Sequence, residues 1–158
     1  MNEQQRAELF EEYFRLSGFV QSYDSYFLTI KTWGVTVSGV AIGVGFSKDV
    51  INYNMQSEMF LIALALGTAF WWTEVRFKLI QLAHVTRQSV LERALQENVY
   101  IKAPALLESF SAESVIQREL GRWRRIVFWP HVMFPHIIFV VLSLILLTIK
   151  VVKHLAAS

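Results

Sequence analysis

Residues 126–149, IVFWPHVMFPHIIFVVLSLILLTI, contain no aspartate, glutamate, lysine or arginine. An α-helix rises about 1.5 Å per residue, so this stretch is long enough to cross a hydrocarbon layer about 30 Å thick. The sequence therefore predicts an integral membrane protein. Composition agrees, because 54% of the 158 residues are hydrophobic, and the length has room for one domain. The chain has no cysteine, which excludes disulfides and thiolate metal sites.

Two further apolar runs predict two more crossings. Residues 27–46, FLTIKTWGVTVSGVAIGVGF, are interrupted only by Lys31, which lies near the start, where its amine can reach the headgroups. Residues 59–73 form a shorter run between Glu58 and Glu74, and extending it by a few residues gives a full crossing. We expect an all-α membrane protein with three transmembrane helices, at residues 27–46, 56–73 and 126–149.

The cations predict how these helices are oriented. With three crossings, residues 1–25 and 75–125 share one side of the membrane, and the tail 150–158 lies on the other. The first side carries eleven of the 15 lysine and arginine residues, so the positive-inside rule predicts that it lies in the cytoplasm. Indole rings favour the membrane interface. The tryptophans fall near the cytoplasmic ends of the crossings: Trp33, Trp71, Trp72, Trp123 and Trp129.

The cytoplasmic residues predict helices as well. Residues 1–25 read as an amphipathic helix, and residues 75–125 read as a helical hairpin. No helix breaker occurs before about Ile101, so the second crossing should continue into the first arm and turn at residues 102–105, before and around Pro104. The apolar stripe on this hairpin needs a partner, either the N-terminal helix or a neighbouring subunit.

Small residues recur at spacings of about four in the first two crossings, which lets helices approach closely in lipid. These residues either pack helices together within one subunit, or they contact a neighbouring subunit or line a pore. Because three helices cannot enclose a polar path, a pore would require a symmetric homo-oligomer. The candidate packing or pore residues are Gly34, Ser38, Gly39, Gly43, Gly45, Ala63 and Gly67.

A basic cluster precedes the third crossing. It either anchors the chain on anionic lipid or binds the phosphates of a nucleotide or nucleic acid through guanidinium groups. The candidate ligand residues are Arg118, Arg122, Arg124 and Arg125, joined by Arg87 and Lys78 from the facing arm.

Two histidines, His131 and His136, lie in the third crossing beside Pro130 and Pro135. They serve either packing or gating, since intramembrane ionisable groups are often functional and prolines free backbone carbonyls. No acid in the same crossing accompanies them. We find no nucleophile, phosphate-loop or paired-histidine motif, so we expect no enzyme, no cofactor and no metal site.

The whole chain resembles the small multi-span transmembrane effectors of bacterial anti-phage defence systems, of the Hailong or cyclic-oligonucleotide type. The likeness rests on TWGVTVSGVAIGVGF (32–46), the short second run and ELGRWRR (119–125). The resemblance implies a gated oligomeric ion channel or membrane-permeabilising effector, regulated by a nucleotide or oligonucleotide and by a cognate nucleotidyltransferase-type partner. The chain departs from that pattern in lacking a separate ligand-sensing domain. The alternative is a non-conducting scaffold in the lipid bilayer that recruits a cytoplasmic partner through the hairpin.

Overall fold

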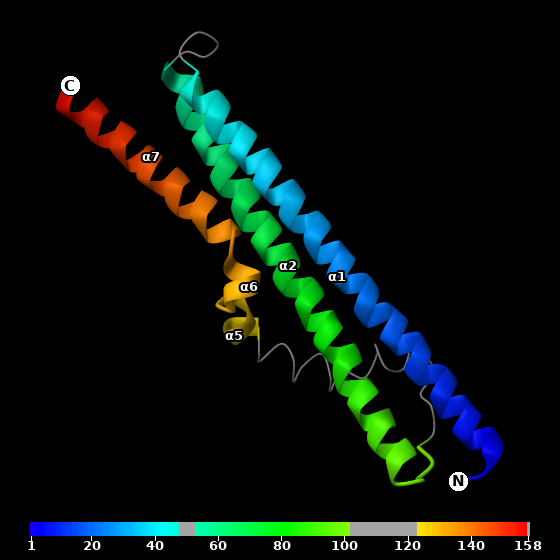
Figure 1. Cartoon of the computed structure of the whole chain (residues 1–158). Coiled ribbons are helices and arrows are strands. Elements are labelled where there is room, and N and C mark those ends of the chain that lie inside the picture. The colour runs from blue at the N-terminus through cyan, green and yellow to red at the C-terminus, as the bar shows by residue number, and fades with distance from the viewer. Residues whose placement is uncertain (48–52, 102–122, 158) are drawn as a thin grey trace. The chain divides into compact units, whose positions relative to one another are not determined.

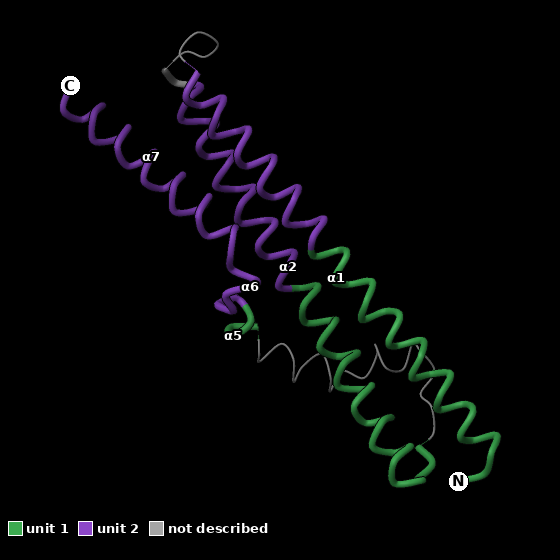
Figure 2. The backbone as a smooth tube through the Cα atoms, in the orientation of Figure 1, with its two compact units in different colours: residues 1–27, 76–126 green, residues 28–75, 127–158 purple. Residues whose placement is uncertain are grey.

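The computed structural model describes residues 1–47, 53–101 and 123–157, which are helical apart from short connections and contain no strand. Its helices are α1 (Glu3–Phe46), α2 (Tyr53–Gln96), α5 (Trp123–Val127), α6 (Pro130–Met133) and α7 (His136–Ala157) (Figure 1). They form two compact units, one of residues 1–27 and 76–126 and one of residues 28–75 and 127–158 (Figure 2). The chain passes from one unit to the other at residues 27/28, where the first apolar run begins, and at residues 75/76, just after the second apolar run ends.

A capping box begins α1. The side chain of Asn2 accepts a hydrogen bond from the backbone N–H of Gln5 at 2.8 Å, and the Gln5 side chain accepts one from the Asn2 N–H at 2.9 Å. Two N–H groups that a helix start would leave unpaired are thereby satisfied. From this start α1 continues without a break through the first apolar run, so the two helices expected at 1–25 and 27–46 are one.

A Schellman turn ends α2 earlier than the sequence predicts. Asn98 has a φ of 55°, and the N–H of Val99 bonds the carbonyl of Ala94 at 2.9 Å. Asparagine tolerates this left-handed conformation, which closes a helix by satisfying its last carbonyls. The helix therefore stops at Gln96, whereas the expected turn at 102–105 lies outside the described residues.

The first unit packs α1 against the second half of α2, antiparallel. Its core joins Leu9 and Leu16 of α1 to Leu91 and Ala94 of α2. The apolar stripe of the predicted first arm is thus covered by the N-terminal helix, which was one of its two expected partners.

Polar and aromatic contacts complete this unit. Arg87 forms a bidentate ion pair with Glu12 at 2.9 and 3.2 Å. The rings of Tyr23 and Phe77 meet edge to face. Burial raises the pKa of Tyr23, and the nearby phenol of Tyr26 adds to the effect. The Tyr23 phenol is protonated at neutral pH, as an ordinary tyrosine with a pKa of about 10 also is.

The second unit packs the other halves of α1 and α2 with α6 and α7. Ala41, Ile42 and Ala63 form its buried cluster, against which Phe139 and Leu146 of α7 pack. Small side chains at the centre let the helices lie close together.

The third apolar run is not the single helix expected at 126–149. It is divided into α5, α6 and α7, with extended backbone at Trp129 and Phe134, each directly before a proline. Proline has no N–H and disfavours helical backbone in the residue before it, which explains both breaks. The long helix of this region consequently starts at His136 and continues past Lys150 to Ala157.

Among the described residues, three helices are long and apolar enough to cross a membrane: those at Glu3–Phe46, Met55–Gln96 and His136–Ala156. This agrees with the predicted all-helical membrane class. The predicted crossings at 27–46 and 56–73 lie inside α1 and α2.

Candidate functional site

The breaks around α6 leave backbone carbonyls without their usual helical partners. In a continuous helix the carbonyl of His131 would accept from the N–H of residue 135, but that residue is a proline and has none. The carbonyl of Val127, the last residue of α5, belongs to a helix end and likewise lacks an intrahelical partner. Inside an apolar unit such carbonyls need other donors.

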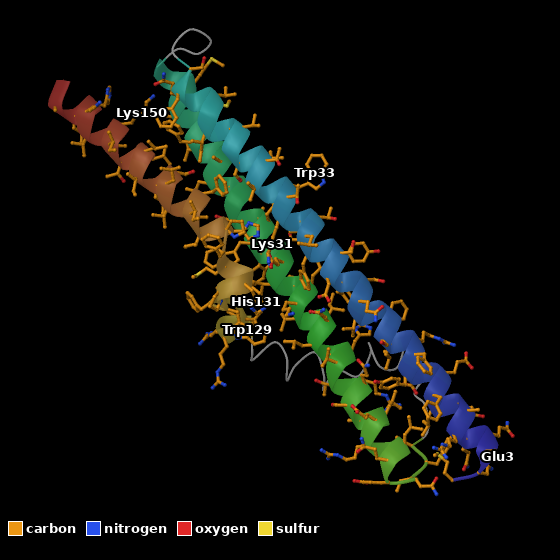
Figure 3. All side chains as sticks on the ribbon, viewed as in Figure 1. Glu3, Lys31, Trp33, Trp129, His131 and Lys150 are labelled. Carbon is orange, nitrogen blue, oxygen red and sulfur yellow. The ribbon has the colours of Figure 1, made fainter. Side chains whose placement is uncertain are left out.

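Side chains from α1 and α2 supply those donors. Lys31 of α1 donates from Nζ to the carbonyl oxygen of His131 at 2.6 Å. Trp71 of α2 donates from Nε1 to the carbonyl oxygen of Val127 at 3.1 Å. Figure 3 labels Lys31 and His131, together with the neighbouring Trp129. The broken segment is thus hydrogen-bonded to both long helices of the second unit.

Glu74 is the centre of the site. Its side chain is only 1% exposed, and its two carboxylate oxygens have different partners. Oε1 lies 3.2 Å from Nζ of Lys31, and Oε2 lies 2.9 Å from Nε2 of His136. Three helices, α1, α2 and α7, therefore meet in one polar network, which we call the Glu74 network (Lys31, Glu74, His136 and the His131 carbonyl).

The hydrogen bonds indicate how the network is charged. Nε2 of His136 faces a carboxylate oxygen, which can only accept, so Nε2 carries the proton. Nδ1 is buried and has no hydrogen-bond partner among the described residues, so a second proton there would be an unpaired donor. A neutral imidazole fits this arrangement, and the Lys31 ammonium then balances the Glu74 carboxylate.

Gly34 makes room for the imidazole. A Cβ atom added to this glycine would lie 2.9 Å from Cε1 of His136 and 3.2 Å from its Nδ1. Any larger residue at this position would displace the ring and with it the bond to Glu74. The small residue predicted for helix packing is thus part of the site.

The other small residues divide into two groups. A Cβ on Gly45 would meet the Phe60 ring at 2.5 Å, and one on Gly67 would touch Val140 at 3.4 Å, while Ala63 is fully buried. These residues pack within the subunit. A Cβ on Gly43, by contrast, would have nothing within 4 Å, and one on Gly39 would meet only a ring atom of Phe139 at 3.8 Å.

Two serines also face the interior of this unit. Ser38 of α1 and Ser143 of α7 are fully buried, and neither hydroxyl has a hydrogen-bond partner among the described residues. Ser38 was among the predicted pore or packing residues, whereas Ser143 was not. The interior of the second unit is therefore more polar than its sequence suggests.

The predicted phosphate-binding cluster is only partly described. Arg118 and Arg122 lie outside the described residues, while Arg124 and Arg125 are exposed on α5. The Arg124 guanidinium stands 5.7 Å from the centre of the Trp123 ring. The two residues expected to join the cluster have other contacts. Arg87 pairs with the carboxylate of Glu12, and Lys78 contacts the side chains of Gln81 and Phe27.

Of the two predicted gating histidines, the ring of His136 belongs to the Glu74 network, whereas His131 contributes its carbonyl. Sequence reasoning missed the pairing of Glu74 with Lys31. It interpreted Glu74 as the boundary of the second apolar run and expected the amine of Lys31 to reach the headgroups. One signal was available: an acid, a lysine and a histidine each lie in or beside a different apolar run.

Comparison of the chain with protein-family models, with curated proteins and with solved structures finds no match.

Proposed function

We propose that this chain is one subunit of an oligomeric, gated ion channel that permeabilises a bacterial inner membrane. The observation that carries the proposal is the buried Glu74 carboxylate, held by Lys31 and His136 among apolar helices. Ionisable groups at membrane depth are costly to bury, and where they occur they commonly belong to ion pathways or gates.

The broken third segment supports the same function. Backbone that is not helical is tolerated within a bilayer only where protein buries it or where it lines a water-filled cavity. Here the interruptions at Trp129 and Phe134 carry the carbonyls that Lys31 and Trp71 bind. A segment fixed by so few side-chain bonds is suited to alternate between two arrangements, as a gate must.

The open glycine positions support an oligomer. Gly43 is exposed, and the space beside it is filled by no other part of the described chain. Small residues that no helix of the same subunit approaches are available to a helix of a second subunit. We propose that Gly43 faces a neighbouring subunit or the conduit between subunits, and that Gly39, one turn earlier and approached by a ring atom of Phe139 at 3.8 Å, lies at the edge of the same surface.

The anti-phage setting, the nucleotide or oligonucleotide regulator and the nucleotidyltransferase-type partner come from the resemblance alone and stay predictions. The exposed Arg124 and Arg125 are the described residues available to such a ligand.

Ion flux from liposomes tests the channel. The native protein, reconstituted into vesicles loaded with KCl, should release K⁺, and Glu74→Gln should alter the rate at least several-fold because it removes the anion that joins three helices. Glu11→Gln is the matched control, since Glu11 pairs with Arg15 in an exposed position in the first unit. No flux from vesicles that demonstrably contain inserted oligomers, with the native protein and with Glu74→Gln alike, would reject the channel.

A non-conducting scaffold is the second candidate. It is favoured by a hollow of about 490 Å³ on the first unit, lined by Arg6, Phe10, Tyr13, Glu92, Leu95 and Gln96. A scaffold predicts that Phe10→Ala releases a co-purifying partner while no variant carries current. The channel predicts flux in vesicles that contain this protein alone.

A further inference from the structure

The oxygen atoms around the Lys31 ammonium have the chemistry of a cation site. Nζ lies 3.2 Å from a carboxylate oxygen of Glu74 and 2.6 Å from the carbonyl oxygen of His131. Hard cations bind such oxygen ligands, and freed carbonyls of interrupted membrane helices coordinate alkali cations. The ammonium group therefore stands where a metal cation could be bound.

We infer that the Glu74 network is a monovalent alkali-cation site, and that the Lys31 ammonium is a tethered cation that occupies it in place of Na⁺ or K⁺. The transport role of this site rests on the proposed channel, but cation binding does not. Oε1 of Glu74 and the His131 carbonyl would hold the ion, and water would complete its coordination.

The charge of the site supports exchange of one cation for another. Glu74 is 1% exposed, so its carboxylate loses most of its hydration and needs a compensating positive charge nearby. His136 provides a hydrogen bond to Oε2 but, as a neutral imidazole, no charge. If Lys31 withdraws, the positive charge that balances Glu74 has to come from elsewhere, and an alkali cation can supply it.

Lys31 has the means to withdraw. Its side chain is 28% exposed, in contrast to the buried Glu74 and His136. A lysine carries its charge on a flexible four-carbon stem and can move its amine toward the headgroups while the stem stays in apolar surroundings. The lysine side chain thus extends from the buried site to the surface of the unit. If it moved away, Oε1 of Glu74 and the carbonyl oxygen of His131 could bind a free ion.

The selectivity expected of the site follows from its ligands. No group of three or more His, Cys, Asp or Glu side chains suited to a metal ion occurs among the described residues. A single carboxylate with one carbonyl neutralises one positive charge, which suits a monovalent ion better than a divalent one. Alkali cations, and small alkylammonium ions that copy the lysine head, are the expected ligands.

Removing the lysine exposes the site to measurement. Lys31→Met keeps the length of the aliphatic stem and removes the ammonium group. We would record thermal unfolding of the purified full chain in detergent, at constant ionic strength, in choline chloride, NaCl, KCl or ethylammonium chloride. The midpoint of Lys31→Met should rise by roughly 5 °C, saturably, when Na⁺, K⁺ or ethylammonium replaces choline. The native midpoint should not depend on which cation is present.

The double variant Lys31→Met/Glu74→Gln is the control, since it has neither the cation nor the anion. It should respond to no cation. If Lys31→Met is folded but equally stable in all four salts, the inference is wrong, and Lys31 is a structural ion pair only. The same holds if Lys31→Met folds in none of them while the double variant folds.

Flux measured on the same proteins separates this inference from the proposed channel. Cation-dependent stability without flux from any vesicle keeps the site and rejects the channel. Flux from native vesicles with no cation response in Lys31→Met keeps the channel and rejects the site.

Discussion

At the scale of single residues, the stability of the second unit depends on a few polar side chains that are buried between apolar helices. A buried carboxylate is tolerated only with compensating charge and hydrogen bonds, because its desolvation costs several kcal/mol. Lys31 supplies the charge, and His136 supplies a donor. Removing one member of such a set leaves the others buried and unpaired, so the loss should exceed what the same change costs at the surface.

Glu74→Ala should accordingly lower the free energy of unfolding by about 3 kcal/mol. The matched substitution Glu11→Ala breaks an i, i+4 pair whose side chains are 72% and 51% exposed, and it should cost under about 1 kcal/mol. Both values are obtainable from reversible unfolding in mixed detergent micelles. Equal losses at the two sites would contradict the buried network.

Two glycines of α1 offer an equally direct comparison. Gly34→Ala would place a methyl group 2.9 Å from the His136 ring, so it should destabilise the fold by about 1–3 kcal/mol. In the monomeric chain in detergent, Gly43→Ala meets nothing within 4 Å and gains helix propensity, so it should be neutral or stabilising by up to about 1 kcal/mol. The measurement is the denaturation midpoint of each variant. If Gly34→Ala were as stable as the native protein, the His136 ring would not pack against Gly34.

At the scale of elements, the sequence predicts long continuous patterns better than it predicts where they are interrupted. The expected continuity of the helix from the second apolar run into the residues after it is confirmed, because no Pro or Gly interrupts α2 after Gly67. The end of that helix at Gln96 was missed, since the lone Asn98 that closes it is a weaker signal than Pro104. Pro130 and Pro135 were seen as sources of freed carbonyls, but one unbroken helix was still expected.

The Glu74 network lay beyond sequence reasoning for a different reason. Lys31 lies 43 positions before Glu74 in the sequence, and His136 lies 62 positions after it. Periodicity reports which face of one helix is apolar, but it does not give the register between helices. Only the packing around Gly34 and Phe70 determines which turn of α7 faces Glu74.

The hydrogen bond that fixes α5 to α2 makes a prediction about the broken segment. Trp71→Phe keeps an aromatic ring and removes the Nε1 donor to the Val127 carbonyl, which should cost about 1 kcal/mol and speed amide exchange in α5. Trp33→Phe is the control because Trp33 is 58% exposed and points away from α1 in Figure 3. Unfolding free energies and hydrogen-exchange rates of both variants give the answer. Unchanged exchange in Trp71→Phe would mean that other contacts hold the segment.

At the scale of the whole molecule, the question is how many times the chain crosses the membrane. Lengths favour three crossings: α7 has 22 residues, and the unbroken α2 can place more residues in the bilayer than the 15 between Glu58 and Glu74. Three crossings would put the two ends of the chain on opposite sides, and the cation distribution predicts that the N-terminal end lies in the cytoplasm. With only two crossings, both ends would share one side.

The absence of cysteine from the sequence allows this to be tested with single introduced thiols. In intact cells a membrane-impermeant maleimide should label Ser47→Cys and Ala156→Cys, whereas Ser22→Cys and Ser89→Cys should react only after the cells are permeabilised. Ser47 lies just after α1, and Ala156 lies in the last turn of α7, so each reports the far end of one crossing. Labelling of Ala156→Cys only after permeabilisation, with Ser47→Cys still labelled in intact cells, would remove one crossing. Because the Glu74 network requires α1, α2 and α7 side by side, that result would contradict this packing within the bilayer, and with it a channel that uses the network.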